Sequence, residues 1–299
     1  MAAQLLIYTV MHGSVYALLA VGFSLIFGVA RILNMAHTAF CVLAAYVLYN
    51  LVSPVWRIEL GLAPAIIISV VAVTLLGMLA YKFVIDRVRE HHGAVLLVTI
   101  ALAIFAEQAL TMRFLNTSAS IDYFITGYTV VSGVKILNDY ILILGMTAVL
   151  ITAVHLFLSK TKMGIAVRAV ANDTEVANLM GISPSRILLI TMTMTTALAA
   201  IAGVLVAPTG LFHTPATWGN WLLVVMVIVV IGGLGSIKGS IVGAAVVAFV
   251  EALCIYDPLK LFGSGTAYLM STFVLLAMVI VLIVRPAGLF GTLFEEEKL

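Results

Sequence analysis

Few side chains in this sequence could do chemistry, and the four that stand out are surrounded by apolar residues. Asn34 and His37 lie three positions apart in the stretch FGVARILNMAHTAF, while Glu107 and Glu251 each lie inside a long apolar run. On a helix, Asn34 and His37 would be one turn apart, so they could face one cavity and hydrogen-bond to each other, to a helix end or to a passing solute. A structural hydrogen bond that pins the chain is an equally open interpretation.

A carboxylate among apolar residues must find a partner, water or a proton. Glu107 and Glu251 could therefore line a pathway, or lie close enough to an interface to stay hydrated. The sequence contains no HExxH, GxSxG, P-loop or paired aspartates, so a catalytic function has no support. Cys41 and Cys254 lie in apolar segments without CxxC spacing, which is typical of membrane-helix side chains rather than of a disulfide or metal site. We expect no cofactor and no metal.

Composition sets the fold class. Of the 299 residues, 64% are hydrophobic and 9% are charged, and the mean hydropathy is +1.23, whereas soluble domains carry roughly 25% charged residues. Apolar stretches recur from end to end, so we predict a single membrane domain over residues 1–299, with the apolar N-terminal segment retained as a first helix. Backbone groups in lipid must be satisfied internally, so we expect an all-α protein without strands. The net charge of +2 and the sparse basic residues predict no nucleic-acid partner.

The apolar runs predict a polytopic bundle of eight or nine helices, because a spanning helix needs about 20 mainly apolar residues. The candidates are residues 5–29, 36–52, 63–85, 94–112, 139–158, 187–207, 219–231, 240–255 and 266–284. Two of them, 219–231 and 240–255, are short and meet at the glycine-rich stretch IGGLGSIKGSIVG. This pattern predicts a broken or re-entrant pair of helices.

The distribution of Lys and Arg predicts the orientation, since basic residues gather in short cytoplasmic loops. Segments 82–92 and 159–187 hold most of the clustered basic residues, whereas 113–138 holds only two. We therefore expect the first two segments in the cytoplasm and 113–138 outside. The alternation of the helices then puts the N-terminus outside and the C-terminus in the cytoplasm.

Segment 159–187 is the least membrane-like part of the chain and contains signals for a short amphipathic helix. Asp173 and Thr174 can cap a helix whose first turn includes Glu175, while Gly181 can end it and Pro184 prevents its continuation. We expect this helix to lie along the cytoplasmic face of the membrane.

Its apolar residues, Val176, Leu179 and Met180, recur at helical spacing. Such a helix is suited to a groove on a partner protein, whose rigid-body movement it could transmit to the membrane helices on either side. A helix that only rests on lipid headgroups would show the same pattern. The residues alone do not separate these two interpretations.

Two glycine-rich breaks lie near the two ends of the chain, at residues 27–40 and at IGGLGSIKG, which contains Gly232, Gly233 and Gly235. Transporters often build a substrate site from discontinuous helices in corresponding positions of two repeats, because unwound backbone supplies polar groups at bilayer depth. Glycines also permit close helix packing in membranes, which is the alternative interpretation. We take the polar residues of the first break and these glycines as candidates for a substrate path.

Four elements together resemble a known family. They are GSVYALLAVGFSLIFGVARILNMAHTAFCVLAAYV, which contains the asparagine-x-alanine-histidine element Asn34 to His37, then TKMGIAVRAVANDTEVANLMGI at 161–182, VVIGGLGSIKGSIVGA at 229–244 and VRPAGLFG at 284–291. In this order and spacing they resemble the permease subunits of branched-chain, or hydrophobic, amino acid ABC transporters, of the type without a long N-terminal extension.

The resemblance implies a permease in the plasma (inner) membrane of a bacterium or archaeon. It would pair with a similar sister permease, expected to form a heterodimer with it, and with two cytoplasmic ATPase subunits and an external, or periplasmic, substrate-binding protein. Segment 161–182 would then dock on an ATPase and drive alternating access. The coupling residues that the resemblance implies are Arg168, Asp173, Glu175, Val176, Leu179, Met180 and Gly181.

The resemblance has one departure and leaves other functions open. The family element usually continues with glycine after the histidine, whereas this chain has Thr38, which could stiffen the break and alter what passes. The same architecture could import urea, an amide, an aromatic acid or a sugar. An ion-coupled carrier, with Glu107 and Glu251 as coupling sites, is the alternative from another class, although the distinctive cytoplasmic segment argues against it.

Overall fold

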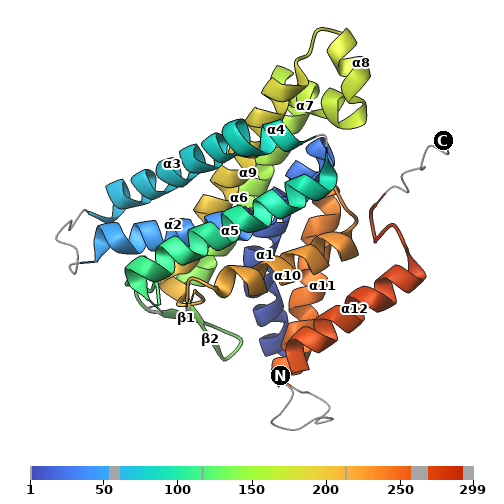
Figure 1. The fold of residues 1–299 in the computed structure, drawn as a ribbon. Coiled ribbons are helices and arrows are strands. Elements are labelled where there is room, and N and C mark those ends of the chain that lie inside the picture. The colour runs from blue at the N-terminus through green and yellow to red at the C-terminus, as the bar shows by residue number, and fades with distance from the viewer. Residues whose placement is uncertain are drawn as a thin grey trace.

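The computed structural model describes residues 2–53, 61–89, 91–115, 118–212, 214–256 and 269–291 (Figure 1). Most of them are helical. The elements are α1 (Ala2–Ala30), α2 (His37–Val52), α3 (Leu62–Ala80), the π-helical turn η2 (Tyr81–Ile85), α4 (Asp86–Val88), α5 (His92–Phe114), β1 (Tyr128–Val131), β2 (Val134–Leu137), α6 (Asn138–Lys160), α7 (Lys162–Asn172), α8 (Thr174–Leu179), α9 (Pro184–Val206), the 3-10 turn η3 (Ala207–Thr209), α10 (Thr217–Gly232), α11 (Ile237–Tyr256) and α12 (Met270–Val284).

Nine apolar helical segments in the described parts of the chain match the predicted ones. Six are long and apolar enough to cross a membrane, and α2, α10 and α12 are shorter apolar helices. The predicted all-α polytopic bundle is therefore confirmed. The last predicted segment, 266–284, begins as an α-helix at Met270, and residues 266–268 lie outside the described chain.

Helix α1 forms the centre of the bundle. Its residues from Gly13 to Ile26 are buried without interruption, and α6, α9, α10 and α11 pack around it. Helix α2 lies against α3, α5, α9 and α10. Outer helices such as α3 and α5 expose large apolar side chains, among them Ile67 and Phe105. A soluble protein rarely exposes such a continuous apolar surface, whereas lipid covers it at no cost.

The bundle has two distinct ends. Figure 1 shows the hairpin β1–β2 near the N-terminus at one end, and α4, α7 and α8 at the opposite end. We call these the hairpin end and the α8 end. The basic segments 82–92 and 159–187 thus share the α8 end, as far as their residues are described, while 113–138 lies at the hairpin end. This arrangement is the one that the charge distribution predicts, whereas the sides of the membrane stay a prediction.

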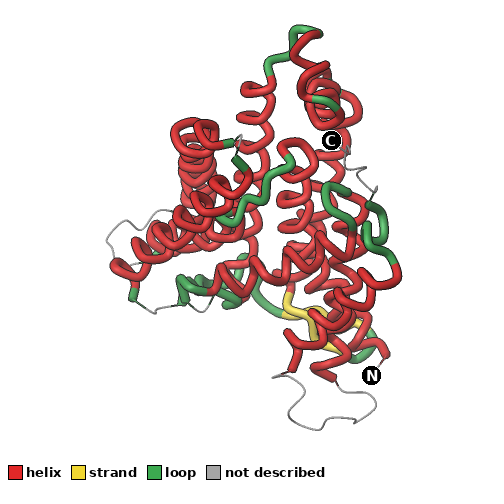
Figure 2. The backbone as a smooth tube through the Cα atoms, turned by 45° about the vertical axis from the view of Figure 1, so that its right-hand side comes forward, coloured by secondary structure: helices red, strands yellow, loops and turns green. Residues whose placement is uncertain are grey.

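The hairpin contradicts the expectation that the chain has no strands. β1 and β2 pair in antiparallel register from Tyr128↔Leu137 to Val131↔Val134, and Figure 2 shows them in yellow beside the helices. Ser132 and Gly133 form the two-residue connection, both with positive φ, 51° and 80°, as a type I′ turn requires. The expectation was wrong because the bilayer rule governs only backbone inside lipid, and this segment lies beyond the helix ends.

Glycines set how closely some helices approach. A Cβ atom on Gly203 of α9 would collide with the carbonyl oxygen of Cys41 in α2, and one on Gly77 of α3 would collide with the Thr196 side chain of α9. These contacts bring backbones together as small residues do at membrane-helix crossings. Helix α9 is therefore locked against both α2 and α3.

We expect Gly203→Ala to destabilise the protein by about 1–3 kcal/mol, because the added methyl group overpacks the α2–α9 crossing. Gly145→Ala in α6 is the matched control, since a Cβ atom there meets nothing within 4 Å and alanine favours helix. Thermal unfolding of the purified protein in detergent checks both variants. Equal melting temperatures for the two variants would contradict the assigned crossing.

Candidate functional site

The first break folds the chain back into the bundle. Helix α1 ends at Ala30, Arg31 has a positive φ of 53°, and α2 begins only at His37. The His37 Nε2 atom lies 3.1 Å from the carbonyl oxygen of Leu19, which is about 16 Å from the end of α1 at a rise of about 1.5 Å per residue. Helix α2 therefore begins inside the bundle rather than at its surface.

Asn34 and His37 are buried, with 1% and 0% of their surface exposed, and they bond to different helices. The Asn34 carboxamide oxygen accepts a hydrogen bond from the backbone N–H of Ala36 at 3.1 Å, and its Nδ2 lies 3.5 Å from the sulfur of Met192 in α9. The His37 ring bonds to α1 instead. Because residues 31–36 are not helical, the two side chains do not have the helical one-turn relation expected from the sequence.

Thr38 starts a polar connection between three helices. Its hydroxyl donates to the backbone carbonyl of Trp218, near the start of α10, at 3.1 Å. The Trp218 indole Nε1 in turn donates to the Glu107 carboxylate of α5 at 2.7 Å. We call this the Thr38–Trp218–Glu107 link. A glycine at position 38, as in the family element, would have no hydroxyl for the first of these bonds.

The two predicted intramembrane carboxylates differ in their surroundings. Glu251 in α11 is 1% exposed and accepts a 2.7 Å hydrogen bond from the Tyr16 hydroxyl of α1. Glu107 is only partly buried. The structure thus encloses Glu251 between α1 and α11, whereas Glu107 lies where the bundle surface begins.

The second break lies elsewhere in the bundle. Gly233 and Gly235 have positive φ values of 101° and 82°, so they turn the chain between α10 and α11. A Cβ atom on Gly28, in the last turn of α1, would lie 3.0 Å from the Gly235 carbonyl oxygen. The break therefore packs against the end of α1, away from the buried start of α2.

The segment after α12 covers the same break. The backbone N–H of Leu289 donates to the carbonyl of Ile231 at 2.8 Å, and that of Phe290 donates to the carbonyl of Gly232 at 2.9 Å. Two of the sequence elements quoted above are therefore in direct contact. The predicted path residues fall into two groups, with Asn34, His37 and Thr38 inside the bundle and the three glycines at its end.

Helix α8 has the predicted boundaries. The Asp173 carboxylate accepts hydrogen bonds from the N–H groups of Glu175 and Val176 at 2.8 and 2.9 Å. Gly181 has a φ of 82° and its N–H bonds to Asn178, while the N–H of Ile182 bonds to Ala177. These two bonds form a Schellman motif, which ends the helix.

The surface of α8 is apolar and open. Val176, Leu179 and Met180 are 54%, 85% and 78% exposed, and Ala177 is the buried side chain of the helix. Figure 1 shows α8 projecting from the bundle. We call Val176, Leu179 and Met180 the α8 patch.

Segment 159–187 also contains a helix that sequence reasoning missed. Helix α7 buries Val167 and Val170 and packs on α1, α6 and α9, while Arg168 on it is exposed. Its sequence, KMGIAVRAVAN, belongs to segment 159–187, in which we expected only the short helix that follows Asp173. The regular spacing of Val167 and Val170 was the available signal.

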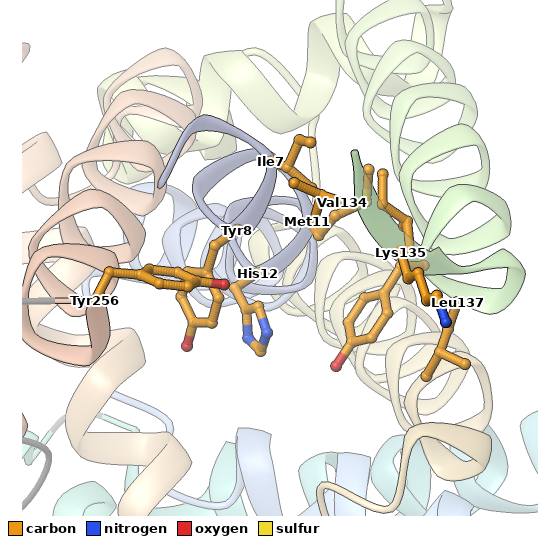
Figure 3. A pocket seen from close by; sticks show the side chains of 10 residues that line it. Ile7, Tyr8, Met11, His12, Val134, Lys135, Leu137 and Tyr256 are labelled. Carbon is orange, nitrogen blue, oxygen red and sulfur yellow. The ribbon is translucent and has the colours of Figure 1, made fainter. Parts of the chain in front are cut away.

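A cavity of about 180 Å³ lies at the hairpin end. The rings of Tyr8 and His12 stack at 4.0 Å between centroids, and Tyr256 meets Tyr8 edge-on at 6.1 Å. Figure 3 shows these three residues on one side of the cavity and β2 residues, including Lys135, on the other. Sequence reasoning missed this cavity because its walls come from four separate segments. Among the described residues, no cluster of His, Cys, Asp and Glu could hold a metal ion.

Comparison with known families identifies the architecture. Residues 5–284 match the family described as the permease component of the branched-chain amino acid transport system. The chain belongs to this family of permease components. Its apolar helices and this family place it among multi-pass membrane proteins, and the family is one of transport components rather than enzymes.

Curated relatives span nearly the whole chain. The high-affinity branched-chain amino acid transport system permease protein BraD of Pseudomonas aeruginosa is 27% identical, over 93% of this chain and 92% of its own. The permease protein LivH of Escherichia coli K12 is 25% identical over the same shares. A probable LivH from Methanocaldococcus jannaschii is 24% identical over 97% of this chain and 92% of its own.

Two further similarities are more distant. The xylose transport system permease protein XylH of Haemophilus influenzae is 31% identical, but over only 43% of this chain and 37% of its own. The solved structure described as PsaBC from Streptococcus pneumoniae in complex with Fab has a TM-score of 0.50 and 12% identity, and the match covers 96% of this chain and 94% of that one. At this identity, the likeness concerns the fold alone.

We expect Asp173→Ala to loosen α8 without unfolding the bundle, because it removes both hydrogen bonds of the cap, which is worth about 1 kcal/mol. Hydrogen exchange of the amides of Glu175 and Val176 should become faster by about fivefold. Asp173→Ser keeps a capping oxygen and serves as the control. Unchanged exchange in the alanine variant would show that the cap does not hold this helix.

Proposed function

We propose that the chain is a permease subunit of an ATP-driven importer of branched-chain or related small amino acids. It pairs with a sister permease as a heterodimer and with two cytoplasmic ATPase subunits. An external binding protein delivers the substrate. Membership of the family and the names of the relatives support this proposal.

The observation that carries the proposal is the α8 patch. Apolar side chains exposed on a helix that stands out from the bundle need a partner, and a groove on another protein is the usual one. The patch is held in place by the Asp173 cap and the Gly181 turn. Arg168 and Glu175 are exposed nearby and supply charges for the rim of such a contact.

Import proceeds by alternating access. A loaded binding protein docks at the hairpin end, the ATPases close on ATP below, and α8 transmits this closure to the bundle. Helix α7 supports the transmission, because it lies between α8 and the central helix α1 and packs on both. The first break, with Asn34, His37 and Thr38, and the glycines Gly232, Gly233 and Gly235 give the helices around the path their discontinuities.

A sugar importer is the second candidate. The partial match to the xylose permease favours it, although that match covers less than half of this chain. An importer of this kind would share the α8 patch and the ATPases. Uptake of leucine and of xylose by the same reconstituted complex distinguishes the two candidates.

We expect Val176→Asp, Leu179→Asp and Met180→Asp, combined in one variant, to abolish ATPase binding, because three carboxylates cannot be buried in an apolar groove. The fold should persist, since these side chains are exposed. Co-purification of the ATPases with the tagged permease in mild detergent, followed by an ATPase assay, measures the effect.

Val130→Asp is the matched control. Val130 is a 57% exposed apolar residue of β1 at the opposite end of the bundle, so its substitution should leave ATPase binding intact. A triple variant that still recovers both ATPases and hydrolyses ATP in step with leucine uptake would refute the docking role of α8. A wild-type chain that transports leucine in liposomes without any ATPase would refute the importer.

A further inference from the structure

Glu107 belongs to a small polar surface inside an apolar region. It is partly buried, and Gln108, next to it on α5, and Asn220, two residues after Trp218 on α10, are exposed. Elsewhere, α5 exposes apolar side chains such as Phe105 and Met112. Glu107 lies about 10 Å from Phe114, the last residue of α5, at about 1.5 Å of rise per residue.

Such a surface does not suit contact with lipid. A carboxylate at bilayer depth is costly and usually faces a bundle interior or a water-filled cavity. Helix α10 also begins inside the bundle. Its Trp218 bonds to Thr38, and Thr38 directly follows His37, which lies inside the bundle. The polar surface of α5 and α10 therefore faces an aqueous path or the boundary with a second permease.

The partner of Glu107 is a neutral group. Its hydrogen bond comes from the Trp218 indole N–H, and the ion pair between Arg89 and Asp86 in the described part of the chain does not involve it. A carboxylate oxygen accepts more than one hydrogen bond, so Glu107 can still receive a positive ligand. The ring face of Trp218 can add cation–π attraction to the same ligand.

We propose that Glu107 and Trp218 form a transient binding site for the ammonium group of the transported amino acid. The inference rests on the proposed function and deepens it by naming the part of the substrate that the chain recognises. A zwitterion that enters a region of low dielectric must exchange water for another partner at its ammonium group. The Glu107 carboxylate is that partner, and the Trp218 indole orients the carboxylate. The apolar side chain of the substrate contacts the apolar residues around the site.

Thr38 is a positioning residue in this arrangement. By donating to the Trp218 carbonyl it joins the start of α2 to the start of α10, so the indole that holds Glu107 is fixed relative to α2. Neutral substrates such as sugars or urea have no ammonium group and would have no use for Glu107. The site therefore predicts selectivity for amines among small solutes.

The test uses the complete transporter in liposomes, with the permease pair, both ATPases and the leucine-loaded binding protein. Glu107→Gln removes the charge but keeps an oxygen that can accept the indole hydrogen bond. It should lower the number of leucine molecules imported per ATP by about tenfold or more, the factor given by losing one charge-assisted hydrogen bond. ATP hydrolysis stimulated by the loaded binding protein should stay within about twofold of wild type, because docking and α8 are untouched.

Two other variants make the result specific. Glu107→Asp keeps the charge and should retain more import per ATP than Glu107→Gln. Met112→Ala changes an 87% exposed apolar side chain of the same helix, outside the polar surface, and should match wild type. Melting temperatures of all variants must agree within a few degrees, and a Glu107→Gln variant that unfolds and loses hydrolysis together with import would assign Glu107 a structural role and overturn the proposal.

The remaining outcomes separate this inference from the proposed function. If the wild-type complex imports leucine and the Glu107→Gln complex imports as many leucine molecules per ATP, the ammonium site alone is overturned. Wild-type import that requires sodium ions, and loses this requirement in Glu107→Gln, would assign Glu107 to a coupling ion and also overturn it. A wild-type complex that hydrolyses ATP without importing leucine would overturn the proposed function and the ammonium site with it.

Discussion

The structure depends on the hydrogen bonds of the backbone between α1 and α2, because this segment is not helical and yet lies inside the bundle. The segment between α1 and α2 is largely buried among protein side chains, so its free N–H and C=O groups need protein partners. The Asn34 side chain accepts from the Ala36 N–H, the His37 N–H bonds to the Asn34 carbonyl, and the Thr99 hydroxyl of α5 lies 3.3 Å from the Met35 nitrogen. These bonds offset the desolvation of the backbone where the chain turns back into the bundle. Helix α2 can therefore begin inside the bundle.

Consequences of that return extend to distant parts of the chain. Because α2 starts within the bundle, Thr38 reaches α10, and α10 in turn presents Trp218 to α5. The imidazole of His37 also needs space against α1, which Gly22 provides, since a Cβ atom there would lie 2.8 Å from the ring. One six-residue departure from helix thereby organises the contacts of four helices.

The glycine break at the other end has a different function. Gly28, Gly235 and the segment around Leu289 bring backbone against backbone, and such contacts leave no room for sliding side chains. One rigid joint therefore forms where α1 ends, α10 ends, α11 begins and the segment after α12 packs against them. Helix α7 packs on both α8 and α1, so α8 is connected to this joint through α7 and α1.

The sequence predicted the features that depend on neighbouring residues, such as helix number and helix ends. It did not predict contacts between residues that are distant in the sequence. The number of apolar helices followed from the length of each run, and both ends of α8 followed from Asp173 and Gly181, whose effects reach only a few residues. The hairpin was missed because a rule for lipid was applied to a loop. The Thr38–Trp218–Glu107 link joins residues more than 100 positions apart, and nothing in the spacing of these residues reveals that they meet.

Glu107 and Glu251 show most clearly why structure is needed to assign a role. Both are single carboxylates in apolar helices, so the sequence gives them equal standing. The Tyr16 hydroxyl and close packing enclose Glu251, whereas Glu107 keeps access to the surface. A path through a membrane must hold its substrate strongly enough to admit it and weakly enough to release it. One accessible carboxylate, held by a neutral indole, offers a partner for one charge of a zwitterion. A site with both a carboxylate and a cation would bind both charges of the zwitterion and hold it more tightly. The single carboxylate therefore better suits a protein that must release its substrate.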